Sequence, residues 1–454
     1  MRFGTGQKWA FGLGSFSQWF INGAFTTWVF SFYFAAIGLP VYLITIAYII
    51  WAISNAFTNP IVGFISDRTR TRFGRRKPYI MIGTVPVLVI EILLWIPPAG
   101  VMGEFVYLLV MLLCYDVFYT MISLPFDSLF PELYTSVNER AQVNMIKQIM
   151  AIVGLLCAFL IPGSLIGQIT IRHGYVINGI VTSIIVGATL LISLKYGVTE
   201  RKEFKLDYKQ EFGFVQSLKY TVRNRGFVLY TIMYFLYEYV LLVLSTTVPL
   251  FTTFVLGQSA FMASIMLGLL FIVGLATVAI WRKLDVKLGS RKAYGISIIV
   301  YIVVSVPMLF VSAYLQALIT AAIMGFGFGG MLYFIYLLIA DVIDDDELKT
   351  GIRREGAFFG VTNFFMRLAM VLSITTVSLV FATNGWEVIN PSTVTPGLIL
   401  GLHMLVVVFP GLALGISLLC LYFYPFTKKK VAENKERMKV LHEEKLGKVQ
   451  ASEL

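Results

Sequence analysis

The chain has 454 residues, of which 58% are hydrophobic and 13% are charged, and its net charge is +11. A soluble domain carries about 25% charged residues and could not bury this much apolar surface in one core. The composition excludes an ordinary soluble protein. The positive charge does not indicate a nucleic-acid partner, because almost all basic residues lie between apolar segments.

Apolar segments of about 20 residues, the length that crosses ~30 Å of hydrocarbon, recur along the chain. We expect no cleavable signal peptide, because the segment from Met1 to Lys8 leads directly into the first of them and no small-residue cleavage site precedes its end. The pattern predicts an all-α polytopic membrane protein with twelve transmembrane helices at 10–36, 42–66, 79–98, 105–130, 144–167, 175–196, 226–254, 261–281, 294–313, 316–339, 356–383 and 397–425.

The distribution of basic residues predicts the orientation. If both termini are cytoplasmic, 34 of the 36 Lys and Arg residues fall in cytoplasmic segments, and only Arg172 and Arg367 do not. Cytoplasmic loops carry this excess of Lys and Arg, and an odd number of spans would destroy the alternation. We therefore expect twelve spans with cytoplasmic N- and C-termini in a multi-pass protein of the plasma membrane.

The longest polar stretch divides the chain into two halves. Residues 1–196 form a predicted six-helix bundle, 197–225 a cytoplasmic linker, 226–426 a second six-helix bundle and 427–454 a charged cytoplasmic tail. The tail is expected to be a solvated helix or disordered, and its lysines at 428–430 would favour anionic lipid headgroups.

An internal repeat supports this division. Asp67 follows the second span and precedes a glycine turn and the basic residues Arg75 and Arg76. Asp285 follows the eighth span and precedes Gly289 and a basic pair that begins at Arg291. The shared order of aspartate, glycine and basic residues predicts two related halves.

Three motifs spread over both halves resemble those of a known family. They are Asn59–Gly63 with Arg72–Pro78, Leu124–Phe126 with Pro131–Glu132, and Ala340–Asp344 with Arg354–Gly356. The chain resembles the glycoside–pentoside–hexuronide:cation symporters, the melibiose permease group of the major facilitator superfamily. The resemblance implies alternating access of two bundles around a central cavity, and a cation gradient that drives uptake of a small-molecule solute by a functional monomer.

The sequence departs from this family where the cation binds. Two acidic positions of helix 2 fall on Asn55 and Asn59, the acid of helix 4 falls on Ser123, and the sugar-binding acid of helix 1 falls on Trp19. An amide supplies a carbonyl oxygen but neither a charge nor a titratable proton. A sodium site of the family's design is therefore not expected, and H+ is the favoured coupling ion, with Na+ left open.

Charged side chains inside apolar spans are functional candidates, because each is costly in lipid. Asp116, Tyr119, Ser123 and Asp127 recur at helical spacing, so they should form one polar stripe on helix 4 that faces a cavity. Asp127 near the end of its helix could alternatively act as a cap or in a salt bridge. Glu91 on helix 3 is expected to be structural.

Two charges remain in the second half. Arg367, near the middle of helix 11, matches a basic residue of the family and needs an anionic partner, for which Asp127 or Asp116 is the candidate. Glu238, flanked by aromatic residues on helix 7, is a candidate proton carrier, although it could instead bind substrate hydroxyls or a basic residue.

Amides and aromatic rings supply the remaining substrate candidates, since sugars stack on flat rings and hydrogen bond to polar groups. Helix 5 begins with Lys147 and Gln148, where the family has a basic substrate-contacting residue. The predicted substrate-binding residues are Gln18, Trp19, Asn22, Tyr119, Ser123, Asp127, Lys147, Gln148, Asn363 and Arg367, and the predicted coupling residues are Asn55, Asn59, Asp116, Asp127 and Glu238.

Charged residues at the cytoplasmic helix ends are expected to form ion pairs that close one state of the cycle. Each such pair contributes only ~0–1 kcal/mol, which is enough to bias two states of similar energy. The predicted gating residues are Asp67, Arg75, Arg76, Asp285, Arg291, Asp341 and Arg354.

The favoured function is proton-coupled symport of a sugar, glycoside or hexuronide. The alternatives are transport of an amphiphilic, lipid-like or other organic anion solute, and an uncoupled facilitator. We expect no enzyme, because the sequence contains no catalytic set, and neither a metal site nor a cofactor other than the coupling ion is predicted. Membrane lipid is the other expected partner.

Overall fold

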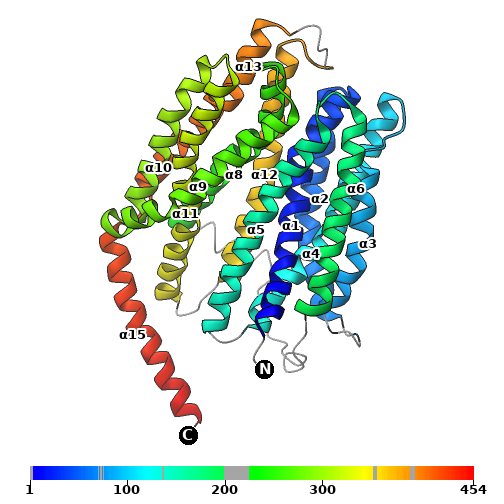
Figure 1. Ribbon diagram of the computed structural model, residues 1–454. Coiled ribbons are helices and arrows are strands. Elements are labelled where there is room, and N and C mark those ends of the chain that lie inside the picture. The colour runs from blue at the N-terminus through cyan, green and yellow to red at the C-terminus, as the bar shows by residue number, and fades with distance from the viewer. Residues whose placement is uncertain are drawn as a thin grey trace. The chain divides into compact units, whose positions relative to one another are not determined.

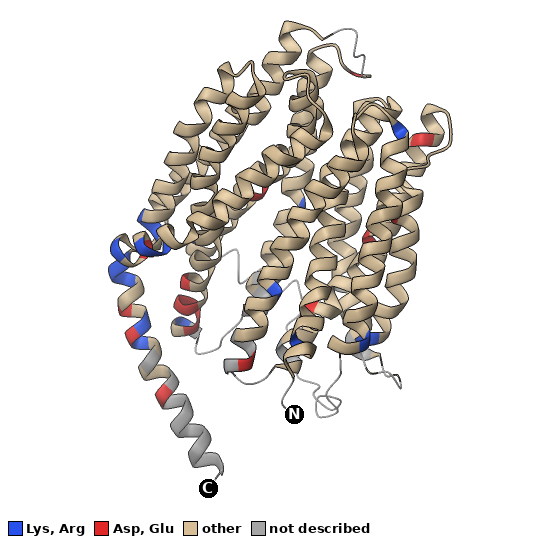
Figure 2. Ribbon diagram, in the orientation of Figure 1, with Lys and Arg blue, Asp and Glu red and all other residues tan. Residues whose placement is uncertain are grey.

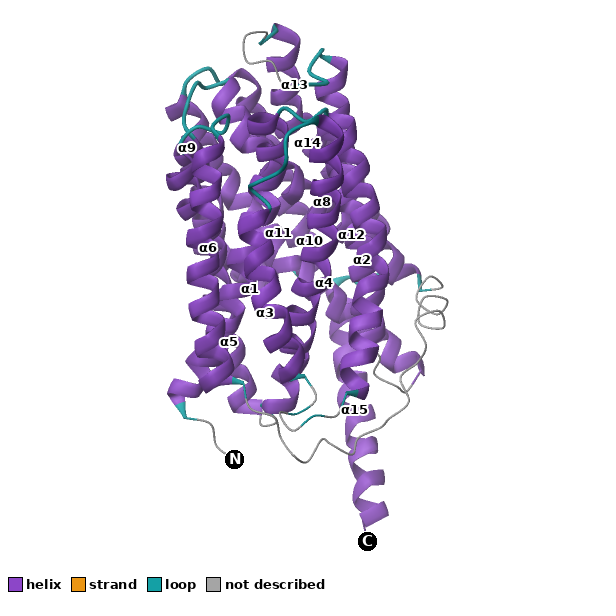
Figure 3. Cartoon of the chain, turned by 90° about the vertical axis from the view of Figure 1, so that its right-hand side faces the viewer, coloured by secondary structure: helices purple, strands orange, loops and turns teal. Residues whose placement is uncertain are grey.

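The computed structural model describes residues 4–69, 71, 74, 76–134, 137–198, 224–350, 355–388 and 394–453. Within these ranges the regular elements are helices, and the only β pairing is an isolated bridge between Thr71 and Gly74. Figure 3 shows long helices joined by loops at their ends. The all-helical prediction is confirmed for the described residues.

The first half contains six long helices, which lie side by side in Figure 1. Short π-helical turns extend α1 over Phe32–Ile37 and α6 over Ser193–Gly197. The six helices are α1 (Thr5–Ser31), α2 (Val41–Arg68), α3 (Lys77–Leu93), α4 (Val101–Leu133), α5 (Val137–Ile166) and α6 (Arg172–Ile192).

The second half repeats this pattern and adds the tail. A 3-10 turn extends α10 over Val306–Phe310. The predicted last span is divided at Val407 into two consecutive helices. The elements are α8 (Arg225–Phe254), α9 (Ala260–Leu288), α10 (Ser290–Ser305), α11 (Tyr314–Thr350), α12 (Glu355–Thr383), α13 (Pro396–Val406), α14 (Val408–Phe423) and α15 (Lys428–Glu453).

Eleven of the described segments are long and apolar enough to cross a membrane, by length and composition. The predicted third span, 79–98, corresponds to α3, which has only 17 residues. Figure 2 shows few charged residues along these helices and many in α15. Most of the predicted linker, residues 199–223, lies outside the described residues.

The chain forms two compact units. The first comprises Met1–Lys209, Leu242–Gly268 and Val371–Leu405. The second comprises Gln210–Leu241, Leu269–Met370 and Val406–Leu454. The first unit therefore includes the first six helices together with the C-terminal ends of α8 and α12, the beginning of α9 and most of α13. The division into halves at the linker stays a prediction.

Glycines permit close packing of α1 against its neighbours. A Cβ at Gly154 of α5 would lie 2.4 Å from the carbonyl oxygen of Phe16. A Cβ at Gly197 would lie 2.4 Å from the backbone nitrogen of Phe11. Such backbone contacts leave no room for a side chain, so α5 and the end of α6 are held directly against α1.

The C-terminal end of α1 and the N-terminal end of α2 contact the region of α12 within the first unit. The hydroxyls of Thr45 and Ser378 lie 2.5 Å apart. The ring of Phe34 packs against that of Phe381 with centroids 4.7 Å apart, and Val41 N–H donates to the carbonyl of Glu387 at 2.8 Å. We call these three contacts together the α2–α12 seal.

Glycines also permit close backbone packing in the second unit. A Cβ at Gly329 of α11 would lie 2.1 Å from the carbonyl oxygen of Gly274 of α9, so the two backbones touch. Trp281 is buried beside them and donates its indole N–H to the carbonyl of Phe326 at 2.8 Å. The pairing satisfies the polar atom of a large apolar side chain inside the bundle.

The charged tail is a helix, α15, and part of it packs on the second unit. Lys428 donates to the carbonyls of Val286 and Lys287 at 3.0 and 3.2 Å. The buried amide of Asn434 donates to Asp345 at 3.3 Å. The tail is therefore anchored to the ends of α9 and α11, whereas the sequence alone indicated only a solvated or disordered segment.

Candidate functional site

A chain of hydrogen bonds links α2 to α4 in the first unit. The Thr120 hydroxyl donates to the side-chain oxygen of Asn59 at 3.3 Å, and the Asn59 amide donates to the side-chain oxygen of Asn55 at 3.2 Å. The Asn55 amide donates in turn to the Asp116 carboxylate. We call these four residues the amide–carboxylate chain.

Helical periodicity places the four residues together. Asn55 and Asn59 are one turn apart on α2, as are Asp116 and Thr120 on α4, so each pair shares one helix face. Gly63 allows α4 to approach closely, since a Cβ there would lie 3.2 Å from Leu124. The two polar faces meet because their helices pack against each other along these turns.

Three members of the amide–carboxylate chain are buried, and Asn59 is partly exposed. Asn55 is 3% exposed and Asp116 is 2% exposed. Beside Asp116, the ring of Tyr115 stacks on Phe25 with centroids 3.9 Å apart, and it also stacks on Tyr119 at 5.6 Å. Hydrogen bonds to a carboxylate are stronger where water is excluded, so this environment strengthens the chain.

The donor–acceptor order determines what this site can bind. The side-chain oxygens of Asn55 and Asn59 each already accept a hydrogen bond from the next member. A hard cation is held by several convergent oxygen ligands. A proton needs a single carboxylate oxygen, and Asp116 supplies it.

The substrate candidates of α1 lie beside Tyr119, whose hydroxyl is 3.5 Å from the backbone carbonyl of Gln18. Gln18 is buried, Asn22 is partly exposed, and the Trp19 indole is 46% exposed. An exposed indole face beside polar groups can stack on an apolar ring face of a solute. The structure thus brings Gln18 and Tyr119 together.

Lys147 and Asp127 form an ion pair with 3.1 Å between the ammonium nitrogen and a carboxylate oxygen. The Lys147 ammonium also lies 4.8 Å from the ring centroid of Phe130 and 5.8 Å from that of Phe126. The Asp127 side chain is 62% exposed, so the carboxylate remains accessible. Of the other candidates here, Gln148 is exposed and Ser123 is partly exposed.

A second polar cluster occupies the second unit. The Tyr234 hydroxyl lies 3.4 Å from that of Tyr336 and within hydrogen-bonding reach of the Glu238 carboxyl group. The positive charge of Arg367 is close enough to act on Glu238. Glu238 therefore has a hydroxyl partner and a cation in its own unit.

Arg367 and the aspartates predicted to pair with it belong to different compact units. Within its own unit, Arg367 interacts electrostatically with Glu238, whereas Asp127 pairs with Lys147 and Asp116 accepts from Asn55. The pairing of Arg367 with Asp127 or Asp116 stays a prediction. The side chain of Asn363 lies outside the described residues.

The predicted gating residues have local partners where the structure describes them. Arg291 donates to the backbone carbonyls of Leu421 and Tyr422 at the end of α14. Asp285 accepts from Ser290 at 2.8 Å and from Tyr333 at 3.5 Å. Such bonds fix the helix ends of one unit.

The other gating candidates differ in how much the structure describes. Asp341 lies near the positive charge of Lys435 on α15. Arg76 immediately precedes α3 and is partly exposed. The side chain of Asp67, and Arg75 and Arg354 altogether, lie outside the described residues.

Glu91 of α3 is fully buried in the first unit, four residues before Trp95, which follows the end of this helix. A Cβ at Gly179 of α6 would lie 2.8 Å from the Glu91 carbonyl oxygen and 2.4 Å from the Trp95 ring, so α3 and α6 cross here. The burial at a helix crossing agrees with the expectation that Glu91 faces the helices of its own bundle.

The sequence interpretation omitted three residues of these clusters. Thr120 lies one turn from Asp116 on the stripe that was identified on α4, so helical spacing alone could have found it. Tyr234 and Tyr336 belong to aromatic-rich segments, and no sequence signal separates them from the other tyrosines. Their roles depend on which helices pack together.

The sequence is similar to those of known transport proteins. Residues 10–428 match the family model described as MFS/sugar transport protein. The chain is 24% identical over 389 residues to the isoprimeverose transporter of Lactiplantibacillus pentosus, covering 84% of this chain and 80% of that protein. It is 25% identical over 436 residues to sodium-dependent lysophosphatidylcholine symporter 1 of Gallus gallus, covering 86% of this chain and 80% of that protein.

Among solved structures, the fold resembles the crystal structure of a D-xylose-proton symporter, with a TM-score of 0.64. The alignment covers 93% of this chain and 98% of that one, at 14% sequence identity. At that identity the likeness shows a shared fold alone.

Proposed function

The chain belongs to the MFS/sugar transport protein family, and we propose that it works as a proton-coupled symporter whose coupling proton binds at Asp116. As a family member with many apolar helices, it is a multi-pass transporter of the plasma membrane and not an enzyme. The proposal goes further than the family in naming the ion, the carboxylate that binds it and the class of solute.

The amide–carboxylate chain is the observation that carries the proposal. Asp116 is the only acidic member of the amide–carboxylate chain. The other three members are neutral, and their hydrogen bonds follow one donor–acceptor order that ends on the Asp116 carboxylate. When Asp116 takes up a proton, it becomes neutral and can accept from Asn55 with its other lone pairs. Protonation therefore changes the charge of the bundle but leaves the hydrogen bond between Asn55 and Asp116 in place.

We propose a sugar, glycoside or hexuronide as the solute. The exposed indole of Trp19 offers a flat face, while Gln18, Asn22 and Tyr119 lie on the adjoining turns of α1 and α4 and offer polar groups. Lys147 and Asp127 add a cation and an accessible carboxylate to the same unit. A polyhydroxylated ring needs such a mixture of a ring face, donors and acceptors.

The finer architecture belongs to the same proposal. We take α3 as a twelfth crossing, because its apolar segment continues past its end at Leu93 to the prolines at 97 and 98. Both termini then face the cytoplasm and the basic loops lie inside. Transport proceeds by alternating access, and one chain is the working unit.

Lys147 and Arg367 also favour a second candidate solute, an amphiphilic or organic anion. Each is a cation on an apolar helix, and a negatively charged group of a solute could bind at either of them. A relative that transports lysophosphatidylcholine is similar over most of the chain. An uncoupled facilitator is the remaining alternative if Asp116 never exchanges its proton.

Reconstituted protein tests the proposal. Proteoliposomes are loaded with one of a panel of sugars, glycosides, hexuronides and lysolipids, and counterflow of the labelled solute identifies the cargo without any gradient. Uptake of that cargo is then driven by an imposed pH gradient or by an imposed sodium gradient. We expect accumulation with the pH gradient at constant sodium.

Three outcomes contradict parts of the proposal separately. Accumulation with sodium and no response to pH would reject the proton. Equilibration without accumulation under either gradient would indicate a facilitator. Counterflow of lysolipids but of none of the sugars would reject the proposed solute class. The coupling ion would then be tested with the same two gradients and a lysolipid as the solute.

A further inference from the structure

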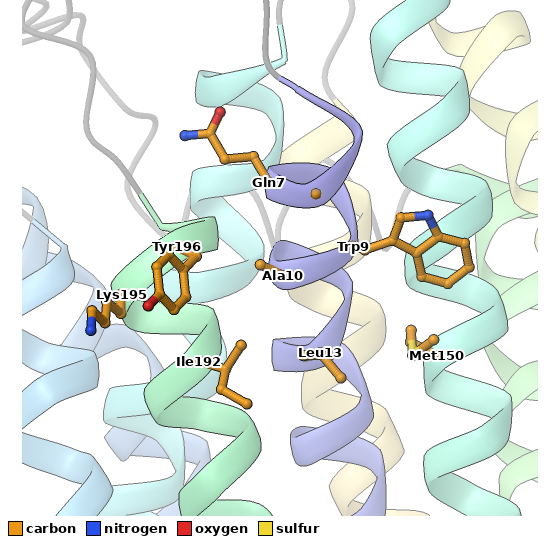
Figure 4. A pocket seen from close by; sticks show the side chains of 9 residues that line it. Gln7, Trp9, Ala10, Leu13, Met150, Ile192, Lys195 and Tyr196 are labelled. Carbon is orange, nitrogen blue, oxygen red and sulfur yellow. The ribbon is translucent and has the colours of Figure 1, made fainter.

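A groove of about 600 Å³ lies at the N-terminal end of α1, away from the amide–carboxylate chain. Its lining residues come from α1, from Met150 of α5, and from Ile192, Lys195 and Tyr196 at the end of α6 (Figure 4). Trp9 and Leu13 are among the residues of α1 that line it. All three elements belong to the first unit, so the groove is a feature of one bundle.

The groove has an apolar part and a polar rim. In Figure 4, Leu13 and Ile192 lie deeper along the helices, whereas Gln7, Lys195 and Tyr196 lie toward the helix ends. The Lys195 ammonium lies 5.1 Å from the ring centroid of Tyr196. Among the described lining residues there is no acidic side chain, so the rim carries a positive charge without a built-in counter-ion.

The position of the groove identifies its surroundings. It lies at one end of the apolar segments Thr5–Ile37 and Arg172–Gly197. Because segments of this length cross the hydrocarbon, we expect lipid headgroups at their ends. Trp9 is 41% exposed and Tyr196 is 53% exposed. Exposed Trp and Tyr at the ends of spans are typical of side chains that sit between acyl chains and water.

The walls of the groove are held together by close contacts within the first unit. Gly197 holds the end of α6 against the backbone of Phe11, and Ser17 and Thr189 connect α1 to α6 with a hydroxyl–hydroxyl distance of 2.6 Å. A Cβ at Gly12 would lie 3.3 Å from Met150, which keeps α5 equally close on the other side. A ligand would meet a preformed surface and would not have to separate helices.

We propose that this groove binds a glycerophospholipid with an anionic headgroup. The acyl chain lies along Leu13, Met150 and Ile192, and the phosphate lies at Lys195 beside the ring of Tyr196. An ammonium group at the membrane surface attracts an anionic headgroup, and one lysine is worth about fivefold in lipid affinity. A zwitterionic lipid gains less because its own cation opposes Lys195.

Trp9 makes the proposal measurable. The full chain is reconstituted into phosphatidylcholine vesicles that contain a fixed fraction of phosphatidylglycerol, with bromine atoms on the acyl chains of either lipid. The Trp9 contribution to fluorescence is the difference between the wild type and Trp9→Phe. We expect brominated phosphatidylglycerol to quench this contribution about fivefold more effectively per molecule than brominated phosphatidylcholine.

Variants at Lys195 separate the groove from general membrane attraction. Lys195→Gln should remove the preference for phosphatidylglycerol, Lys195→Arg should keep it, and Lys283→Gln, which removes an exposed lysine from α9, should leave it unchanged. Equal quenching by both lipids in the wild type would overturn the proposal. A preference that survives Lys195→Gln, or is lost equally in Lys283→Gln, would overturn it as well.

Discussion

Asn55 of α2 donates its side-chain amide to the carboxylate of Asp116 on α4. The family resemblance places acidic residues at positions 55 and 59, where this chain has amides. Asp116 is therefore the only negatively charged member of the amide–carboxylate chain. A cation site with one carboxylate has a different chemistry from one with several.

Restoring an acid at position 55 should restore the attraction for sodium. Asn55→Asp would place two carboxylates in contact, and their repulsion favours a shared cation. We expect uptake by Asn55→Asp to be stimulated several-fold by sodium in the range in which the wild type does not respond. The measurement is initial uptake against sodium concentration at constant pH.

The matched control for this prediction is Asn55→Leu, which removes the same hydrogen bond without adding a charge. It should impair transport and gain no sodium response. If Asn55→Leu and Asn55→Asp respond to sodium equally, the added carboxylate is not the cause.

Replacement of Lys147 should weaken solute binding more than it weakens the fold. Its pair with the exposed Asp127 contributes only ~0–1 kcal/mol to stability. A lost hydrogen bond between a charged group and a solute costs about tenfold or more in affinity. We expect Lys147→Gln to raise the KM for uptake by about this factor, with a melting temperature close to that of the wild type.

Lys147→Arg should keep much of the affinity because the positive charge is retained. A KM unchanged in Lys147→Gln would remove Lys147 from the substrate site. A large fall in melting temperature with no change in KM would instead assign it a structural role.

The α2–α12 seal should open during transport. The hydroxyls of Thr45 and Ser378 are 2.5 Å apart, so cysteines at both positions lie within reach of a disulfide. We expect oxidation of the Thr45→Cys, Ser378→Cys double variant to abolish net uptake, and reduction to restore it. Each single cysteine variant, treated identically, controls for oxidation elsewhere; full uptake by the cross-linked protein would show that this contact is static.

The crossing of α1 and α5 should not tolerate a larger residue. A Cβ at Gly154 would lie 2.4 Å from the Phe16 carbonyl oxygen, so Gly154→Val forces the helices apart. Overpacking of this kind costs about 1–3 kcal/mol and should lower the melting temperature measurably. Gly411→Ala is the control, because nothing lies within 4 Å of a Cβ there; equal melting temperatures for both variants would contradict the packing argument.

The membrane class and the family were predictable because hydropathy, charge placement and the motifs in both halves are local properties of the sequence. The polar stripe of α4 was also predictable, since Asp116 and Tyr119 recur at helical spacing. The hydrogen-bond partners of these polar residues could not be predicted from the sequence. Asn55 meets Asp116 only because α2 packs on α4, and Glu238 approaches Tyr336 only because α8 packs near α11; such pairings depend on tertiary contacts between distant segments.

The helix boundaries were also not fully predictable from the sequence. Hydropathy placed the first span at 10–36, whereas α1 begins at Thr5 and its π-helical extension ends at Ile37. Helix ends are determined by backbone hydrogen bonds that extend beyond the apolar run. The docking of α15 through Asn434 was hidden for a related reason, because a charged helix carries no signal for which side chains become buried, here Asn434 and Met438 among the described residues.

The central claim is that Asp116 carries the coupling proton, and Asp116→Asn tests it most directly. The variant keeps the size of the side chain and an oxygen that can accept from Asn55, but it cannot exchange a proton at neutral pH. Concentrative uptake under a pH gradient and counterflow without a gradient are measured on the same proteoliposomes, with Glu238→Gln as the matched acid-to-amide change. The account predicts that Asp116→Asn loses concentrative uptake and keeps counterflow, whereas Glu238→Gln still accumulates solute. Accumulation by Asp116→Asn at the wild-type level, or uncoupling in Glu238→Gln alone, would contradict it.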